Sequence, residues 1–461
     1  DVNSIMPNLG YEIEDFQSYT WQITNWKDLE KEVRSPKFKA GGCNWRILLY
    51  PYGKINTDSV SIYLGFDDPL GASTEWYSCV QFAFVLWNPK EPTLCVSHHA
   101  QYRFTTEEPY WGFNRFCEQR NLFVNHTRSL IENNACNITA CVRIIKDPTG
   151  ILWHNFTNYN SRKVTGYVGL KNQGATGSLN VSLQLLYSIN YFRKAIYQIP
   201  TEEDESGKSV SLAIQRIFYQ LQISNDPVET VELTNSYGWN LHDCSIQRDF
   251  LDIFKFMFIG NLRNKMNIIS FPALKNTNVA LTLEVLGCKN LVDSFNNFVQ
   301  EVSFESSYYI AGYGLQDTKK SITFESFPPI LNLVLRRWVY IESRETVVKI
   351  NDLYEYPMEI DLQNYLSFDA DKSKSHKYLL HGVVIHDGDK SGGLYYQYLR
   401  HKKNGKWTKF FNDKVTPATV KEVLNDNFGG RNKRWFPAAY VLTYIRESDI
   451  DDILSPVFPE D

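Results

Sequence analysis

In the first third of the chain, apolar and polar positions alternate over short runs. Such a period of two is typical of strands with one buried face. The runs that we predict to be strands are residues 19–26, 43–50, 60–64, 76–86 and 137–145. Proline and glycine separate them, as in the turn at residues 51–53. Several short strands with such turns predict a β-sandwich.

Further along, the apolar period lengthens to that of a helix. The apolar positions of the first such stretch are Leu179, Leu183, Leu185, Leu186 and Ile189. They predict one apolar face of a buried helix, and residues 210–222 show the same periodicity more clearly. Residues 378–386 are almost continuously apolar, which predicts a buried strand. We expect His381 and His386 on this strand to be packed side chains.

A glycine-rich turn leads into the first of these helices. Gly169 and Gly174 interrupt the apolar pattern, and Asn172 and Gln173 lie between them. Many enzymes place a nucleophile where such a turn enters a helix, because free backbone N–H groups and the helix dipole favour a thiolate or an oxyanion. In this chain the turn closes with Gly177, so the position expected for a nucleophile has no side chain.

The bulk composition is that of a globular protein. The chain has 461 residues, 43% of them hydrophobic and 22% charged; at roughly 100–200 residues per domain, it has room for about two to four domains. The net charge is −4 and no long run of Lys or Arg occurs, so nucleic-acid binding is not indicated. Eight cysteines without any Cys-x-x-Cys pair fit reduced thiols and argue against structural zinc. We expect no metal, no cofactor and no membrane span, and a nuclear or cytoplasmic location.

The predicted sandwich resembles the MATH (TRAF-like) domain. Its motifs are Tyr-Thr-Trp-x-Ile-x-x-Trp at residues 19–26, Ser-Pro-x-Phe-x-Ala-Gly at 35–41 and Tyr-Trp-Gly-Phe at 110–113. The family binds extended peptides along a sheet edge through backbone hydrogen bonds. In the protease subfamily with this domain, an Asp that recognises a peptide serine precedes the Trp; here Tyr110 replaces the Asp and Trp111 remains. The resemblance implies a peptide groove at these two residues with a changed motif preference, while simple packing is the alternative role for Trp111.

The rest of the chain resembles the ubiquitin-specific proteases of the MATH-bearing (HAUSP-like) subfamily. Tyr-Val-Gly-Leu-Lys-Asn-Gln-Gly-Ala-Thr at residues 167–176 is similar to their first signature box, which continues with the catalytic cysteine. Residues 247–254 and 407–413 are similar to later boxes. The resemblance implies a papain-like α+β fold after the β-sandwich. It also implies reduced fingers, the β-ribbon that grips ubiquitin in this family, because the chain runs almost straight from residue 264 to residue 279.

This resemblance places the family's catalytic positions on named residues. Gly177 lies at the position of the cysteine, Leu394 at that of the histidine base, and Phe411, followed by Asn412, at that of the acid that orients the base. A cysteine protease needs a thiolate, a base and a group that holds the base. We therefore expect a degenerate triad and no catalytic residue. Asn172, whose counterpart helps to form the oxyanion hole, is retained.

From these observations we predict five segments. Residues 1–16 are a lead-in, 17–146 a MATH-like β-sandwich, 147–165 a connector, 166–447 a pseudo ubiquitin-specific protease domain and 448–461 a tail.

For the function, the degenerate triad predicts a pseudoenzyme that acts as a non-catalytic interaction scaffold or as a subunit of a larger assembly. The alternatives are a reader that binds ubiquitin or a ubiquitin-like protein without cleaving it, and a residual deubiquitinase. Since reduced fingers remove part of the family's grip, we expect ubiquitin binding to be doubtful. The expected partners are proteins, bound in part as an extended peptide on the MATH domain, and not nucleic acid or membrane.

Overall fold

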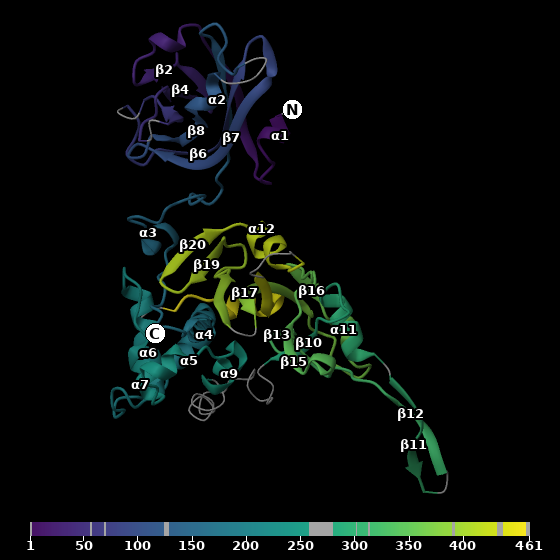
Figure 1. Ribbon diagram of the computed structural model, residues 1–461. Coiled ribbons are helices and arrows are strands. Elements are labelled where there is room, and N and C mark those ends of the chain that lie inside the picture. Colours follow the sequence, from purple (N-terminus) through teal and green to yellow (C-terminus); the bar gives the residue numbers. More distant parts are fainter. Residues whose placement is uncertain are drawn as a thin grey trace. The chain divides into compact units, whose positions relative to one another are not determined.

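In the computed structural model the described residues are 2–55, 58–68, 71–123, 129–257, 280–300, 302–311, 314–389, 392–430 and 437–457. The chain divides into two compact units, Asp1–Thr157 and Asn158–Asp461 (Figure 1). The segment at residues 264–279, on which the expected reduction of the fingers rests, lies outside the described residues.

The first unit is a sandwich of two antiparallel sheets, which confirms the predicted β-sandwich. One sheet has the order β1-β9-β6-β7, with bounds Ile13–Ile23, Cys136–Ile145, Tyr77–Asn88 and Glu91–Thr105. The other has the order β2-β4-β5-β8, with bounds Val33–Arg34, Cys43–Tyr50, Ser59–Phe66 and Tyr110–Glu118, and β3 (Phe38–Ala40) pairs with β4. Two short helices, α1 (Val2–Ile5) and α2 (Gln119–Phe123), accompany the sheets.

The core of this unit lies between the sheets and is aromatic. Trp45 on β4 is fully buried, donates its indole N–H to the carbonyl oxygen of Ala40 at 2.9 Å, and packs edge-on against Phe104 of β7. The first predicted strand stops at Ile23, before the predicted end, because Trp26 turns into the core and begins a short 3-10 helix, Trp26–Asp28. A buried tryptophan thus ends β1.

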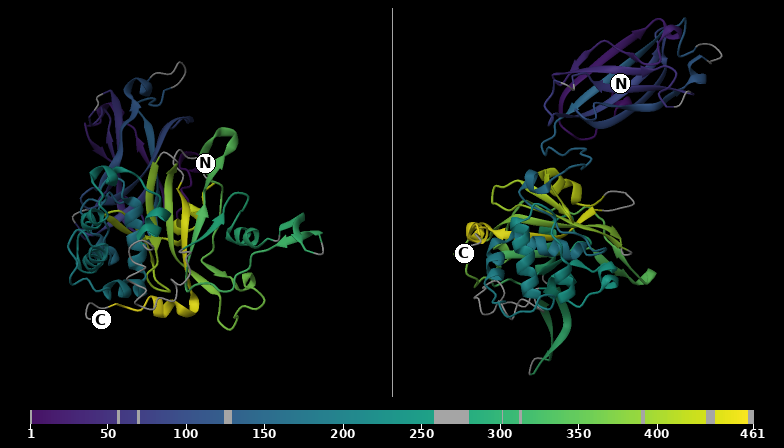
Figure 2. Two further views of the ribbon diagram at one scale, coloured as in Figure 1. Left: turned by 90° about the horizontal axis from the view of Figure 1, so that it is seen from below. Right: turned by 90° about the vertical axis from the view of Figure 1, so that its left-hand side faces the viewer.

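The second unit is built on a mixed sheet of eight strands. Seven follow the order β10-β13-β21-β17-β18-β19-β20, and β16 pairs with β17. Their bounds are Leu281–Glu284, Ile330–Arg336, Pro437–Arg446, Lys377–Asp389, Gly392–Leu399, Trp407–Phe411, Lys414–Ala418 and, for β16, Glu359–Asp361. Two separate hairpins join β11 (Val302–Ile310) to β12 (Gly314–Lys320) and β14 (Trp338–Ile341) to β15 (Thr346–Lys349). The β11–β12 hairpin extends away from the main sheet (Figures 1 and 2).

Helices cover this sheet. Those that precede the sheet in the sequence are α3 (Ser161–Thr165), α4 (Gly177–Ser188), α5 (Asn190–Tyr197), α6 (Val210–Ile223), α7 (Val231–Ser236), α8 (Leu241–Ser245) and α9 (Phe250–Lys255). This helical stretch, teal in Figure 2, gathers on one side of the sheet. The later helices are α11 (Leu291–Val299), α12 (Val420–Val423) and α13 (Ile450–Ile453). Within the described ranges, no helix is long and apolar enough to cross a membrane.

Helix α4 is buried on all sides. The sequence predicts one apolar face, yet every residue from Ser178 to Ser188 is buried. Its polar side chains fit this environment because they are hydrogen-bonded: the Ser182 hydroxyl donates to the carbonyl oxygen of Ser178 at 2.8 Å, and the Gln184 amide donates to that of Val168 at 2.9 Å. The helix begins at Gly177, so the candidate site lies at the end of the most enclosed helix of the unit.

Candidate functional site

The glycine-rich turn is held against the turn between β19 and β20. The backbone N–H of Leu170 donates to the carbonyl oxygen of Asn412 at 2.8 Å. A Cβ atom at Gly169 would collide with the backbone of Asn412 and Asp413, so only glycine permits this approach. Gly174 has φ of +123°, which also favours glycine. The sequence pattern of the turn therefore has a direct structural cause.

Asn172 closes the turn. Its side-chain oxygen accepts from both the backbone N–H and the hydroxyl of Thr176, each at 3.0 Å. The same hydroxyl accepts from the backbone N–H of Gln173 at 3.0 Å, and no side chain caps the N-terminus of α4. Asn172 therefore stabilises the turn, and the oxyanion role that the resemblance implies stays a prediction.

Gly177 begins α4 and lies beside β18. A Cβ atom built there would contact only Tyr395, at 3.8 Å or more. Its backbone conformation is not one that requires glycine. The glycine is therefore not explained by crowding or by the backbone, and the position has room for a small side chain.

Leu394 does not fill the site. Its side chain is 50% exposed, while the next residue, Tyr395, points into the core and lines the space next to Gly177. The backbone N–H of Gly393 donates to the side-chain oxygen of Gln247 at 2.8 Å, which ties the start of β18 to the segment ahead of α9. Since alternate residues of a strand face opposite sides, Tyr395 and Gln397 face α4.

Phe411 and Asn412 differ in their relation to Gly177. Phe411 packs edge-on against Tyr396, with ring centroids 6.0 Å apart. Asn412, with φ of +50°, accepts the amide N–H of Asn180 at 3.2 Å and lines the same small cavity as Gly177. The structure thus brings Gly177, Asn412 and Tyr395, the residue after Leu394, together around one cavity. Their assignment to the triad positions stays a prediction.

Sequence reasoning missed Asn180 and Gln397, which line this cavity. Asn180 lies one turn after Gly177 on α4, and Gln397 lies two residues after Tyr395 on β18. Asn180 lies between Leu179 and Val181, and Gln397 lies between two tyrosines. A polar residue between large apolar or aromatic neighbours was the available signal.

The two histidines of β17 are packed, as predicted. His381 is buried with its Nε2 2.8 Å from the hydroxyl of Ser188. Burial, and after it the Arg400 guanidinium, lowers the pKa of His381 to about 3. Burial and the Lys349 ammonium lower the pKa of His386 to about 4. Both rings are therefore neutral at neutral pH, and both are enclosed by the core.

In the first unit, the predicted peptide-groove residues lie on the surface. Tyr110 and Trp111 of β8 are exposed, Trp111 to 44%. One face of the Trp111 ring stacks on Tyr102 of β7, with centroids 4.1 Å apart and planes 2° from parallel. β7 and β8 are the end strands of their sheets. Trp111 is therefore packed on one face, and a groove for peptides stays a prediction.

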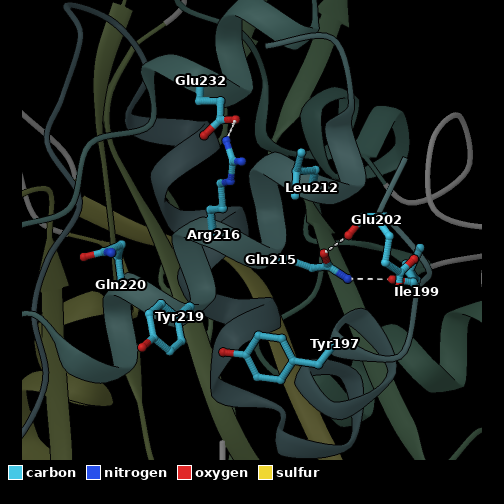
Figure 3. Close-up of a pocket in the computed structure, with 10 residues that line it drawn as sticks. Tyr197, Ile199, Glu202, Leu212, Gln215, Arg216, Tyr219, Gln220 and Glu232 are labelled. Carbon is cyan, nitrogen blue, oxygen red and sulfur yellow. Dashed lines mark hydrogen bonds and ion pairs between the residues drawn. The ribbon is translucent and has the colours of Figure 1, made fainter. Parts of the chain in front are cut away.

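A larger groove lies on α5 and α6 of the second unit. It has a volume of about 770 Å³, and Tyr197, Leu212 and Tyr219 are among its walls. Figure 3 shows Arg216 and Glu232 pointing toward each other at one end, where their charged groups are 2.5 Å apart. None of the predicted site residues lines it. In the described part of the chain, no group of His, Cys, Asp or Glu side chains is arranged to hold a metal ion.

Comparison with known proteins gives two family matches. Residues 168–444 match the family described as ubiquitin carboxyl-terminal hydrolase, and residues 18–142 match the MATH domain. Among curated relatives, ubiquitin carboxyl-terminal hydrolase 15 of Schizosaccharomyces pombe is 41% identical over 96% of this chain and 45% of its own length. Ubiquitin carboxyl-terminal hydrolase 15 of Saccharomyces cerevisiae is 36% identical over 100% and 43%, and ubiquitin carboxyl-terminal hydrolase 7 of Drosophila melanogaster is 32% identical over 95% and 40%.

The chain spans less than half the length of these curated relatives. Among solved structures, the SAGA Ubp8/Sgf11/Sus1/Sgf73 DUB module bound to ubiquitin aldehyde is similar with a TM-score of 0.50 and 22% identity, over 61% of this chain and 70% of that chain. At this identity the likeness shows the fold alone. With the two family matches it confirms the expected order of a MATH β-sandwich followed by a ubiquitin-specific protease fold.

The comparisons contradict three predictions from the sequence. The non-catalytic scaffold and the assignment as no enzyme are wrong, because the relatives that match nearly the whole chain are named as hydrolases. The expectation that ubiquitin binding is doubtful is also wrong, since the same relatives are named as hydrolases of ubiquitin carboxyl termini. The physical reason is that those predictions rest on three single positions, Gly177, Leu394 and Phe411, whereas the match to the hydrolases extends over the glycine-rich turn, α4 and β18 together.

Proposed function

Because the chain belongs to the ubiquitin carboxyl-terminal hydrolase family and carries a MATH domain ahead of the hydrolase domain, we propose that it binds ubiquitin and acts as a deubiquitinase. The observation that carries the proposal is the extent of the hydrolase match. It runs from residue 168 to residue 444 and includes the glycine-rich turn, α4 and β18. These segments lie side by side in the structure, and the proposed place of the ubiquitin tail is beside them.

The chemistry of this site differs from that of a complete thiol protease. Hydrolysis of an isopeptide bond adds water across the C–N bond and releases a carboxylate and a lysine amine. Gly177 offers no thiol and Leu394 accepts no proton, so water is the attacking group that needs no side chain at position 177. Loss of a general base alone slows such reactions about 10²–10⁴-fold. We therefore expect slow turnover by the wild-type chain.

The proposal is tested first by binding. We expect monomeric ubiquitin to bind with micromolar affinity, about −8 kcal/mol, in titration calorimetry and in polarisation of labelled ubiquitin. Gly177→Trp should weaken this binding, because an indole is too large for the cavity beside Tyr395 and would project from the start of α4. Trp111→Ala, on the surface of the first unit, is the control and should leave it unchanged. Absence of binding by both methods up to millimolar ubiquitin would overturn the proposal.

Hydrolysis is tested separately with ubiquitin that carries a fluorophore amide at its C-terminus. We expect release of the fluorophore above the rate in buffer, and loss of that release in Gly177→Trp. Release at the buffer rate would remove the hydrolase part of the proposal even if ubiquitin binds.

A further inference from the structure

A small cavity with both apolar and amide side chains in its wall lies next to Gly177. Its volume is about 10 Å³, and Asn180, Gln184, Gln397 and Asn412 are among the residues that line it. Asn180 is 3% exposed and Gln397 is fully buried. A cavity of about 10–15 Å³ is the smallest that admits one water molecule. The size of this cavity is therefore at the lower limit for a single water.

Two side-chain oxygens of this lining have no hydrogen-bond partner among the described residues, Asn180 Oδ1 and Gln397 Oε1. The orientation of each amide is fixed by its nitrogen. Asn180 Nδ2 donates to the carbonyl oxygen of Leu170 at 3.3 Å and to Asn412 Oδ1 at 3.2 Å. Gln397 Nε2 donates to the carbonyl oxygen of Val181 at 3.0 Å. Turning either amide over would place oxygen against oxygen, so both unpaired atoms are true acceptors.

We propose that this cavity is a binding site for one water molecule, which donates one hydrogen to Asn180 Oδ1 and the other to Gln397 Oε1. Buried polar atoms are almost always paired, and buried water commonly supplies the missing partner. A water molecule has two donors, the number that two acceptors need.

Other ligands fit the cavity less well. Calcium takes about six to eight oxygen ligands and magnesium about six, whereas no carboxylate lines this cavity. A buried cation without a counter-charge is also costly. Because an amide oxygen does not take up a proton at neutral pH, the water is held in place and not activated for attack.

The site goes beyond the proposed function because it concerns how the segments around Gly177 are held together. Through Asn180 and Gln397 the water joins α4 to β18. The Asn180 amide already reaches the glycine-rich turn at Leu170 and the β19–β20 turn at Asn412. One water would therefore complete a network that ties together the segments around Gly177, whether or not the chain hydrolyses ubiquitin.

The direct test is a crystal structure of the full chain at about 1.5 Å or better. We expect a density peak at hydrogen-bond distance, about 2.7–3.2 Å, from both Asn180 Oδ1 and Gln397 Oε1. Well-ordered side chains with no peak between them would overturn the proposal. So would a peak with several oxygen contacts near 2.4 Å, which is the distance of a bound calcium ion.

A variant gives a second, independent readout. Gln397→Met keeps the shape of the side chain and removes its amide, so the peak should be lost from the variant's crystal structure. We expect Tm to fall by about 2–4 °C relative to Gln363→Met, an equivalent change at an exposed position of the same unit. A Gln397→Met protein that keeps the peak and matches the control in Tm would contradict the proposal.

Discussion

The backbone N–H of Leu170 donates to the carbonyl oxygen of Asn412 at 2.8 Å, across 242 positions of the chain. This bond seats the glycine-rich turn on the β19–β20 turn and leaves no room for a side chain at Gly169. The two glycines of this segment therefore differ in the space around them. A Cβ atom would collide with backbone at Gly169, whereas it would fit at Gly177.

The two glycines make a matched pair of variants. Gly169→Ala should destabilise the second unit by about 1–3 kcal/mol, because its Cβ atom would collide with the backbone of Asn412 and Asp413. Gly177→Ala should be neutral or stabilising by about 0.4–1 kcal/mol, because the Cβ atom fits and alanine restricts the unfolded chain. Urea unfolding measures both. If both variants change the free energy of unfolding equally, the backbone of Asn412 and Asp413 does not lie as close to Gly169 as the structure shows.

A thiol placed at position 177 should be reactive. In Gly177→Cys the thiol would lie at the N-terminus of α4, where the helix dipole lowers a thiol pKa. We expect this variant to form a covalent adduct with ubiquitin aldehyde, visible by mass spectrometry, and the wild type to form none. Two of the native cysteines compete poorly, since burial raises the pKa of Cys136 and of Cys79 to about 12; the exposed Cys95 is replaced by Ser in both proteins.

Adding a histidine base at position 394 should make the thiol at position 177 catalytic. In the double variant Gly177→Cys, Leu394→His, we expect hydrolysis of the fluorophore amide to rise about 10²-fold or more over Gly177→Cys alone. Gly177→Ser, Leu394→His serves as the control with a weaker nucleophile. If the double variant is no faster than the single one, Leu394 does not lie at the position of the base.

The buried His381 makes the second unit sensitive to acid. Its pKa is lowered from 6.5 to about 3, so below pH 6.5 the unfolded chain binds a proton that the folded chain does not. Stability is then lost as the pH falls from about 6.5 toward 3, by up to about 1.4 kcal/mol per pH unit for this group. Replacing it by glutamine, which keeps a polar partner for Ser188, should remove about that slope between pH 6.5 and 4.5.

The control for this prediction is His242→Gln, on an exposed position of α8. It should unfold with the same pH dependence as the wild type. If His381→Gln also keeps the wild-type slope in urea titrations at several pH values, His381 is not buried as a neutral ring.

An ion pair in the first unit allows a comparison of buried and exposed charges. Asp147 is 3.1 Å from Arg103 with both side chains largely buried, and it also accepts the backbone N–H groups of Gly150 and Leu152. Removing one partner of a buried pair costs about 3–5 kcal/mol, so Asp147→Ala should strongly destabilise this unit. The neighbouring pair Lys146–Glu12, at 2.9 Å, is exposed. Glu12→Ala should therefore cost at most about 1 kcal/mol in the same urea titration.

Asp147 also makes contacts that the sequence alone does not predict. Residues 147–165 were predicted as a connector because proline and glycine follow the last strand. In the structure, Asp147 holds residues as far as Leu152 against Arg103 of β7. No local sequence pattern predicts this ion pair, because Arg103 lies 44 positions before Asp147.

The strands and helices also differ in how well the sequence predicts them. The bounds of β4 and β9 agree closely with the prediction because apolar and polar residues alternate in both sequences, even though nearly every residue of β9 is buried. β7 is not among the predicted strands, although its apolar residues alternate with polar ones and pack against the core of the first unit: Leu94, Val96, Ala100, Tyr102 and Phe104. At the site, the turn and α4 could be predicted from glycine and leucine spacing. The pairing of Gln397 with Val181 could not, since it joins residues 216 positions apart.

The enclosure of α4 has a consequence for hydrogen exchange. A backbone N–H in a helix that is covered on every side meets deuterated solvent only when the strands and helices around it separate. We expect the amides from Leu183 to Tyr187 to be among the slowest to exchange and to report opening of the whole second unit. Amides of the exposed helix α8 should exchange through local fraying. The helix that begins at Gly177 would then mark the most slowly opening part of the domain.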